Sequence, residues 1–418
     1  MKQKKLTTDN RQLTTVAAKQ GLRFHEVRAL FFIFCFLLMS HAASAVDLGI
    51  DVLAEHHFDL LRGKRVGLVT NQTGVNQHGV LTRLVLKKNV HLVALYTPEH
   101  GLDGVEKAGV DVRSRRDRLT GLTAFSLYGD TRKPTPQMLA GIDVLVFDMQ
   151  DIGCRSYTYI STMAKCLQAC AEQHKEFVIL DRPNPLGGER IEGMPLDPQW
   201  VSFVGQLPVP YVHGMTMGEL ALMANEKGWM SPIKADLKVI RMRGWSRSMA
   251  WSNIGLAWVK PSPNIPNALS PFYYVVTGVV SELGDGIDIG IGTTSAFEFF
   301  TAHWIKPAMY PYLLSKCNGM GVYPYMTRCG KGVRFKINPR SGNLAAASLY
   351  LLAASYHQTH GTLIARAPHE KLNLFYKVYG SSSIKEQLAR KSPEQIIASW
   401  TPFLNHFRCE RQPFLLYQ

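Results

Sequence analysis

Four short apolar runs in the first half of the chain constrain its fold more than any other feature. They read RVGLVT, HLVALY, DVLVFD and FVILD and occupy residues 65–70, 91–96, 143–148 and 177–181. None of them alternates cleanly with polar residues. Continuous apolar runs of this length are typical of strands that are buried on both faces of a parallel sheet.

Segments compatible with helices separate these runs, most clearly at residues 79–88 and 159–174. Strands that alternate with helices are typical of an α/β protein with a doubly wound parallel sheet. We therefore predict a doubly wound α/β domain over residues 46–262, and we expect it to carry the chemistry.

Polar, turn-forming residues follow each apolar run, in the sequences NQTG, TPEHG, DMQDIGCR and DRPNPLGG. Ligands of open parallel sheets bind at the carboxyl ends of the strands. One polar strand end would be explained as a helix cap or a turn, but four successive ones favour a site. The expected site residues at these ends are Asn71, Glu99, His100, Asp148, Gln150, Asp151, Arg155, Asp181, Arg182 and Asn184.

The pattern changes in the second half of the chain. The segment VKPSPNIPN (Val259–Asn267) has three prolines and two asparagines, which is typical of a connection between domains. Beyond it lie a glycine-rich stretch, a strand-like GVRFKI at residues 332–337, and helical patterns at residues 344–356 and 393–407. These features predict a smaller, mixed α/β domain over residues 263–418 that packs on the first.

The first 45 residues are predicted to be a signal peptide. The apolar stretch ALFFIFCFLLMSHAASA follows basic residues and ends in Ala43-Ser44-Ala45, which matches an A-x-A cleavage site. The alternative is a membrane anchor, but the apolar core is shorter than the ~20 residues that span a bilayer. We therefore expect a periplasmic or secreted protein with no stable membrane insertion after cleavage.

The net charge of +15 falls to +10 without this leader, which has seven Lys/Arg and two Asp/Glu. A basic surface could contact anionic polymers such as cell-wall glycan, or it could serve solubility alone. No run of Lys/Arg is interleaved with aromatic residues, so we expect no nucleic acid partner.

Metal and cofactor signals are weak. Six cysteines follow the leader, an even number that permits disulfides in an exported protein, and Cys317–Cys329 is the first pair to test. Neither C-x-x-C nor H-x-x-x-H spacing occurs, so no structural zinc is expected. The NQTG turn matches neither G-x-G-x-x-G nor a Walker motif. We predict no metal and no cofactor.

Seven motifs occur together: TNQTG, PEHG, SLYG, LVFDMQDIGCRSYTYISTM, LDRPNPLGG, HGMTMGELA and PSPNIPN. In this order they resemble the exo-β-N-acetylmuramidase (NamZ-like) family, formerly a family of unknown function and now glycoside hydrolase family 171. The resemblance extends from Gly49 to Tyr417. It implies a Rossmann-like domain, a smaller C-terminal domain and an active site in the cleft between them.

The resemblance also implies an activity. It implies that the protein releases N-acetylmuramic acid from the non-reducing end of peptidoglycan fragments, and that the glutamate of PEHG, Glu99, is the catalytic acid. Many members have EGTNxSxGRGT early in the second domain, where this chain reads SELGDGIDIGIGTTSAFE. Thr293 replaces the arginine, and Glu282 or Asp285 takes the acidic position. This departure concerns the details of substrate recognition more than the fold or the reaction class.

Glycoside hydrolysis requires a proton donor at the leaving oxygen and a group that handles the developing oxocarbenium ion. Glu99 is the predicted donor. Pro98 ends the strand ladder and Gly101 lets the chain turn away, so the carboxyl group can be held at this edge of the sheet. Asp148 or Asp151 is the expected second acid. Alternatively, the 2-acetamido group of the sugar acts as an internal nucleophile and an acidic residue orients it.

The remaining candidates would bind the sugar. Its lactyl carboxylate requires a cation, ideally a bidentate arginine, and Arg155 and Arg182 are the candidates; the alternative for each is an ion pair with a nearby aspartate. Asn71, His213 and Asn264 could bind hydroxyl groups, and His213 could equally be a core residue. Tyr157 and Tyr159 could stack on the sugar, although tyrosines that open a helix more often belong to the core.

Two other functional classes compete with this prediction. A non-catalytic glycan-binding protein of the cell wall would need no acid at Glu99. An amidase, esterase or transpeptidase would need a nucleophile with a base, but the chain has no G-x-S-x-G motif. Cys154 has no compelling histidine partner in the sequence and is expected to be structural.

Overall fold

A seven-stranded sheet forms the centre of the first half of the protein. The computed structural model describes residues 46–328 and 330–418. The four apolar runs form β1 (Val66–Thr70), β2 (Leu92–Thr97), β5 (Val144–Asp148) and β6 (Glu176–Leu180), which confirms the predicted parallel sheet. Three further strands complete it: β3 (Arg115–Arg116), β4 (Thr123–Ser126) and β7 (Leu237–Ile240). The strand order is β3-β4-β2-β1-β5-β6-β7, and only β3 runs antiparallel to its neighbour.

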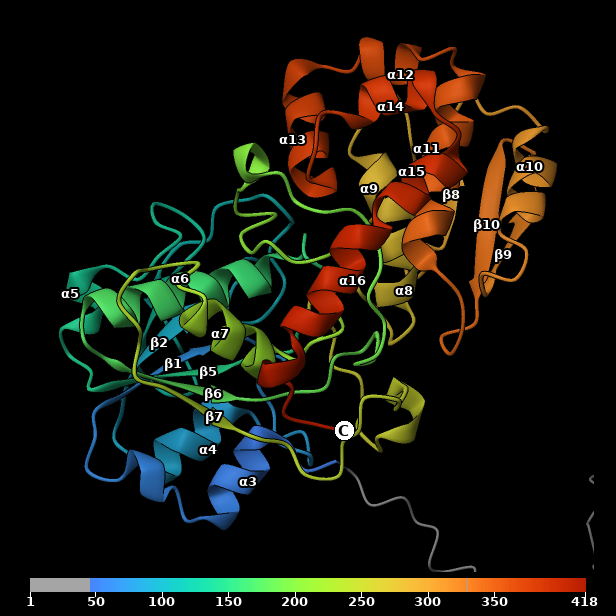
Figure 1. Cartoon of the computed structure of the whole chain (residues 1–418). Coiled ribbons are helices and arrows are strands. Elements are labelled where there is room, and N and C mark those ends of the chain that lie inside the picture. Colours follow the sequence, from blue (N-terminus) through green and yellow to red (C-terminus); the bar gives the residue numbers. More distant parts are fainter. Residues whose placement is uncertain (1–45, 329) are drawn as a thin grey trace, which may run out of the picture. The chain divides into compact units, whose positions relative to one another are not determined.

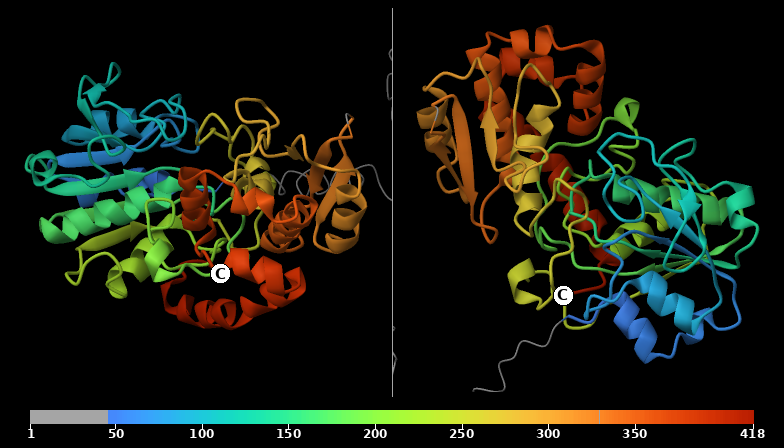
Figure 2. Two further views of the ribbon diagram at one scale, coloured as in Figure 1. Left: turned by 90° about the horizontal axis from the view of Figure 1, so that it is seen from above. Right: turned by 180° about the vertical axis from the view of Figure 1, so that it is seen from behind.

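Helices cover both faces of this sheet (Figure 1). On one face lie α3 (Gly49–Glu55) and α4 (Thr82–Asn89), and on the other lie α6 (Thr158–Glu172) and α7 (Met217–Glu226). Successive strand residues point to opposite faces, so Leu68 packs in the cluster that contains Leu86 of α4, whereas Val69 packs in the cluster that contains Met163 of α6. Figure 2 shows the same layers from two further sides. The doubly wound α/β architecture is therefore confirmed.

The strand order places the expected site. The chain moves outward from β1 in two directions, toward β2 on one side and toward β5 on the other. Thr70 and Asp148, the last residues of β1 and β5, are partners in the register. A doubly wound sheet binds ligands in the crevice outside the carboxyl ends of its strands at such a switch point.

The second half contains a smaller antiparallel sheet of three strands in the order β8-β10-β9, comprising β8 (Phe299–Thr301), β9 (Val322–Met326) and β10 (Gly332–Ile337). The surrounding longer helices are α10 (Met309–Lys316), α11 (Leu344–Gln358), α13 (His369–Tyr379), α14 (Ile384–Arg390), α15 (Pro393–Ser399) and α16 (Thr401–Glu410).

The helical pattern at residues 393–407 forms two helices, α15 and α16, rather than one. Pro402 lies in the first turn of α16, where a missing N–H group costs no intrahelical hydrogen bond. Short helices complete the fold: η1 (Asp59–Leu61), α5 (Pro136–Leu139), η2 (Pro198–Trp200), η3 (Trp251–Asn253), α8 (Ser270–Tyr273), η4 (Tyr274–Gly278), α9 (Val279–Ser281), α12 (Thr362–Ala365) and η5 (Gln412–Phe414).

The described residues form one compact unit. A single hydrophobic cluster includes Met163 of α6 and Leu351 of α11, so the core is continuous across the predicted domain boundary at residue 262, and that boundary stays a prediction. The predicted signal peptide lies outside the described residues. Cys329 does so too, and the predicted Cys317–Cys329 pair therefore stays a prediction. Within the described ranges, no helix has the length and apolar character needed to cross a bilayer.

Candidate active site

Glu99 lies two residues beyond the end of β2, as the PEHG motif predicted, and only 6 % of its surface is exposed. Its Oε1 accepts a hydrogen bond from the N–H of Gly109 (2.7 Å), and its Oε2 accepts one from Oγ1 of Thr158 (2.6 Å). The first donor belongs to the loop after β2 and the second to the start of α6. Two separate segments therefore fix the orientation of this carboxylate.

The backbone turns sharply immediately after Glu99. His100 and Gly101 both have left-handed φ angles, of 69° and 77°. A non-glycine residue in this region is uncommon, and its imidazole helps to hold the turn, because Nδ1 of His100 lies 2.8 Å from the carbonyl oxygen of Glu106. His100 is therefore a support for the loop that contacts Glu99.

Three tyrosines lie within electrostatic reach of this carboxylate: Tyr157 and Tyr159, which are buried, and Tyr274, which is partly buried. The ring centroids of Tyr157 and Tyr159 are 4.8 Å apart, and those of Tyr157 and Tyr274 are 6.2 Å apart. Burial raises the pKa of all three hydroxyl groups, and the negative charge of Glu99 adds to the increase. Asn71 donates to the hydroxyl of Tyr159 (2.8 Å), so the end of β1 joins the cluster.

The connection between the two halves also reaches this cluster. The Tyr159 hydroxyl donates to the carbonyl of Pro261 (2.5 Å), which belongs to the proline-rich segment. Tyr274 begins a π-helical segment, η4, that interrupts the helix from Ser270 to Ser281. Single π-turns within helices are frequent at functional sites. Segments from both halves therefore meet beside Glu99.

Asp151 is a second buried carboxyl group in this region. One oxygen, Oδ2, accepts a hydrogen bond from the N–H of Gly153 (2.7 Å), whereas Oδ1 has no hydrogen-bond partner among the described residues. Burial raises the pKa of Asp151 to about 7. Its charge also contributes to the raised pKa of Tyr157 and Tyr159, so these two tyrosines lie within electrostatic reach of both Asp151 and Glu99.

Asp148, the other expected second acid, is fully engaged in an ion pair. Its Oδ1 lies 2.5 Å from Nε of Arg182, and its Oδ2 lies 3.0 Å from Nη2. Thr82 donates a further hydrogen bond to Oδ2 (2.5 Å), and Arg182 also donates to the carbonyl of Val75 (2.5 Å). Both side chains are about 95 % buried or more. The contacts favour a structural function for both residues.

We expect Arg182→Ala to lower the free energy of unfolding by about 3–5 kcal/mol, because removal of one partner leaves the other charge buried and uncompensated. Urea unfolding followed by circular dichroism measures this change. The matched control is Arg390→Ala, whose exposed pair with Glu386 should contribute ~1 kcal/mol or less. Equal losses in the two variants would contradict the assignment.

Arg155 is also enclosed by the protein. Its Nη1 donates to the carbonyl oxygens of Met194 and Val209 (both 2.9 Å), and its Nη2 donates to that of Tyr379 (2.8 Å). The side chain is completely buried, which lowers its pKa to about 10. Arg155 therefore joins distant backbone segments, and these contacts favour support over substrate binding.

Three other predicted residues at the strand ends make internal contacts. Asp181 accepts hydrogen bonds from Thr216, Tyr417 and the N–H of Gly218 at the start of α7, and burial raises its pKa to about 6. Gln150 donates to the carbonyls of Asp151 and Pro183, and Asn184 donates to that of Met215. These side chains hold the loops in place.

His213 is buried and uncharged. Burial, together with the charge of Arg411, lowers its pKa to about 3. Its Nδ1 accepts a hydrogen bond from the N–H of Met215 (3.2 Å), and its Nε2 has no partner in the described part of the chain. His213 and Asp151 both line a cavity of about 10 Å³.

The two candidates from the second half lie on loops. Oδ1 of Asn264 accepts a hydrogen bond from the N–H of Gly292 (3.0 Å), which ties the proline-rich segment to the glycine-rich stretch. Glu282 is half-buried, burial raises its pKa, and its charge affects the hydroxyl of Tyr274. Thr293 is exposed and bonds to the carbonyl of Gly290 within its own turn.

Four residues of this region were not predicted. Thr158, Tyr128 and Tyr274 interact with Glu99, and Arg132 contacts the ring of Tyr128. Thr158 and Tyr128 belong to the motifs SYTYIS and SLYG, so their position in these motifs was the available signal. The pKa of Tyr128 is raised by burial and by the Glu99 carboxylate, with which its hydroxyl interacts. No comparable signal in the sequence marks Tyr274 or Arg132.

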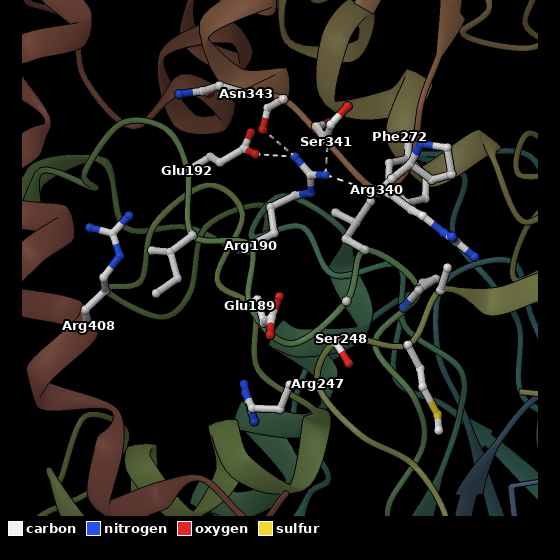
Figure 3. Close-up of a pocket in the computed structure, with 18 residues that line it drawn as sticks. Glu189, Arg190, Glu192, Arg247, Ser248, Phe272, Arg340, Ser341, Asn343 and Arg408 are labelled. Carbon is white, nitrogen blue, oxygen red and sulfur yellow. Dashed lines mark hydrogen bonds and ion pairs between the residues drawn. The ribbon is translucent and has the colours of Figure 1, made fainter. Parts of the chain in front are cut away.

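A cavity of about 560 Å³ lies elsewhere, between the segment Pro185–Glu192 and residues 339–343 (Figure 3). None of the predicted site residues lines it. Arg190, one of the arginines that line it, pairs with Glu192 and donates to the carbonyl of Gly342. The cavity is therefore separate from the Glu99 cluster. No group of three or more His, Cys, Asp or Glu side chains within the described ranges is arranged to hold a metal ion.

Comparison with known proteins identifies the family of this chain. The profile of the N-terminal domain of exo-β-N-acetylmuramidase NamZ matches residues 66–269, and the profile of its C-terminal domain matches residues 272–417. The peptidoglycan β-N-acetylmuramidase NamZ of Bacillus subtilis (strain 168) is 38 % identical over 387 residues, which cover 89 % of this chain and 91 % of that protein.

Two crystal structures of DUF1343 family proteins from Bacteroides fragilis NCTC 9343 are also similar. One is 40 % identical with a TM-score of 0.80, and the other is 29 % identical with a TM-score of 0.67. Each comparison covers 90 % of this chain and 99 % of the other chain. The predicted family is thus confirmed, and the chain belongs to the exo-β-N-acetylmuramidase NamZ family.

Proposed function

We propose that this protein is an exo-acting β-N-acetylmuramidase that releases N-acetylmuramic acid from the non-reducing end of peptidoglycan fragments. Its membership of the NamZ family and its 38 % identity to a peptidoglycan β-N-acetylmuramidase support this proposal. The observation that carries it is the pair of buried carboxyl groups, Glu99 and Asp151, near one tyrosine cluster.

Glu99 is the general acid in this proposal. It donates its proton to the glycosidic oxygen while the bond from this oxygen to C1 breaks, so the aglycone leaves as an alcohol. Hydrogen bonds from Gly109 and Thr158 hold the carboxyl group in one orientation. A fixed donor avoids the entropy cost of orienting it during the reaction.

Asp151 is the second carboxyl group. In its ionised form it either receives a proton from the water that attacks C1, attacks C1 itself, or orients the 2-acetamido group of the sugar for internal attack. Its unpaired Oδ1 supports this assignment, as does a pKa of about 7, which allows both protonation states near neutral pH. Asp148 is less suitable, because Arg182 and Thr82 occupy both of its oxygens.

Two chromogenic substrates test the proposed activity. We expect the protein to release nitrophenolate from the β-glycoside of N-acetylmuramic acid much faster than from that of N-acetylglucosamine. Release of the terminal sugar from a disaccharide headed by muramic acid would show that cleavage is exo-acting. Faster cleavage of the N-acetylglucosamine glycoside would contradict the proposed specificity, and activity toward neither would favour a glycan-binding protein.

We also propose that the protein is exported to the periplasm or beyond, because the first 45 residues comprise a basic leader, an apolar core and an A-x-A site. Sequencing of the N-terminus of protein recovered from cell fractions tests this proposal. We expect the mature chain to begin at Val46, and a cytoplasmic protein with an intact leader would contradict it.

A further inference from the structure

Arg132 is a cation held beside the proposed acid. Its guanidinium carbon lies 3.4 Å from the ring centroid of Tyr128 and 5.4 Å from that of Phe203. The two rings are themselves 5.7 Å apart. The Tyr128 hydroxyl in turn interacts with the carboxylate of Glu99. One tyrosine side chain thus separates a guanidinium group from the proposed acid.

The donors of Arg132 are largely unused. A guanidinium group has five N–H donors, but the one ion pair of Arg132 with the residues that the structure describes is a 3.5 Å contact from Nη2 to Asp111, whose side chain is 72 % exposed. Nη1 is buried and has no hydrogen-bond partner within the described ranges. A buried donor without an acceptor is costly, so this atom is suited to a ligand oxygen.

Arg155 and Arg182, the two arginines that the sequence suggested for binding the lactyl carboxylate, are instead engaged in contacts within the protein. Arg155 donates to three carbonyl oxygens, and Arg182 is paired with Asp148 and bonded to the carbonyl of Val75. Neither can turn to a ligand without leaving a buried acceptor unpaired. Among the three, Arg132 alone combines unused donors with partial exposure.

The aromatic contacts make Arg132 suited to a carboxylate in particular. Cation–π contacts with Tyr128 and Phe203 hold the guanidinium group without using its N–H donors, which lie in the plane of the group. A held, planar guanidinium group binds a carboxylate through two parallel hydrogen bonds. Lysine could not reproduce this geometry.

We propose that Arg132 binds the lactyl carboxylate of N-acetylmuramic acid and thereby selects this sugar over N-acetylglucosamine. This inference rests on the proposed function. The lactyl group is attached to O3 of the sugar, two carbons from C1, where the bond is cleaved. The cation must therefore lie near the acid without contacting it, and the intervening Tyr128 meets this requirement.

The test compares three chromogenic β-glycosides: that of N-acetylmuramic acid, its lactyl methyl ester, and that of N-acetylglucosamine. Arg132→Ala should lower kcat/KM for the acid by roughly 10- to 100-fold, chiefly through KM, because a charge-assisted bidentate contact is lost. The ester and the N-acetylglucosamine glycoside should change by less than about threefold. Arg132→Lys should recover only part of the loss, since the charge remains but the paired hydrogen bonds do not.

Arg118→Ala is the matched control, because Arg118 is an exposed arginine with no ion pair among the described residues. It should leave all three values unchanged. An equal loss on the three substrates in Arg132→Ala would overturn the proposal, because it would mean that Arg132 only positions Tyr128 and Glu99. An unchanged preference for the acid over its ester would overturn it as well.

A binding measurement separates this proposal from the proposed function. Titration calorimetry with free N-acetylmuramic acid and free N-acetylglucosamine requires no catalysis. The wild-type protein should bind the first sugar more tightly, and Arg132→Ala should abolish this difference. Suppose that the wild-type protein cleaved none of the glycosides but bound N-acetylmuramic acid more tightly, and that Arg132→Ala abolished this preference. The hydrolase proposal would then fail and the assignment of Arg132 would stand. Equal binding of both sugars by the wild-type protein would overturn the assignment.

Discussion

Glu99→Gln is expected to lower kcat for a natural muramic acid disaccharide by about 10²–10⁴-fold, because a glutamine cannot donate the proton that the leaving oxygen requires. The substitution preserves size. The glutamine oxygen can still accept from the N–H of Gly109, and its amide group can donate to Oγ1 of Thr158. The variant should therefore stay folded with an almost unchanged KM. Steady-state kinetics on the disaccharide and a thermal unfolding curve measure both quantities.

The aglycone provides a second test of the same residue. A nitrophenolate leaves with little protonation, so the loss caused by Glu99→Gln should be much smaller on the chromogenic glycoside than on the disaccharide. Glu106→Gln is the matched control, since Glu106 lies exposed on the same loop and should tolerate the change. Near wild-type turnover of the disaccharide by a folded Glu99→Gln variant would remove Glu99 from this function.

The centre of the fold could be predicted because its strands are buried on both faces. Such burial favours apolar residues at successive positions, and the central residues of β1, β2, β5 and β6 have this character. The strands that were not predicted lie toward the edges of the sheet. β7 is only partly buried, and β3 has two exposed arginines, so their sequences contain no equivalent signal.

The site could be predicted only in part, because an apolar run locates the end of a strand but not the partners of a side chain. The position of Glu99 could be predicted, because the end of β2 is clear from the sequence. The contacts of Arg155 and Arg182 depend on residues far away in the sequence: Arg155 donates to Tyr379, and Arg182 pairs with Asp148 rather than with the adjacent Asp181. Local sequence cannot determine such pairs.

The same reason explains why Arg132 was not identified. Phe203, which packs on its guanidinium group, lies 71 positions later in the chain. Whether an arginine has unused donors depends on the three-dimensional arrangement of its neighbours. The lactyl carboxylate is expected to need a cation, and the two arginines that follow strand ends were the candidates that the sequence offered. An arginine on the loop after β4 carried no such positional signal.

Asp151→Asn is the second substitution for which we expect a large effect, a fall in kcat of about 10²–10⁴-fold if the carboxylate acts as a base, nucleophile or orienting group. Asparagine retains an oxygen that can accept from the N–H of Gly153, so the loop should keep its conformation. The matched control is Asp236→Asn, because Asp236 is exposed on the segment before β7. This control should keep wild-type kinetics.

The pH dependence distinguishes the possible functions of Asp151. Because burial raises its pKa to about 7, the ionised fraction increases as the pH rises through 7. If Asp151 acts as a carboxylate, kcat/KM should fall by about tenfold for each pH unit below 7, whereas loss of the proton of the catalytic acid sets a separate basic limb. Asp151→Asn should then abolish the acidic limb and leave the basic limb in place. If Asp151 were instead the proton donor, Asp151→Asn would abolish the basic limb, on which the rate falls as the pH rises above 7. An acidic limb near pH 7 that persists in Asp151→Asn would exclude Asp151 as its source.

Adding azide to the Asp151→Asn variant separates attack on C1 from orientation of the 2-acetamido group. Azide replaces a missing nucleophile or base and restores turnover, but it cannot orient the 2-acetamido group.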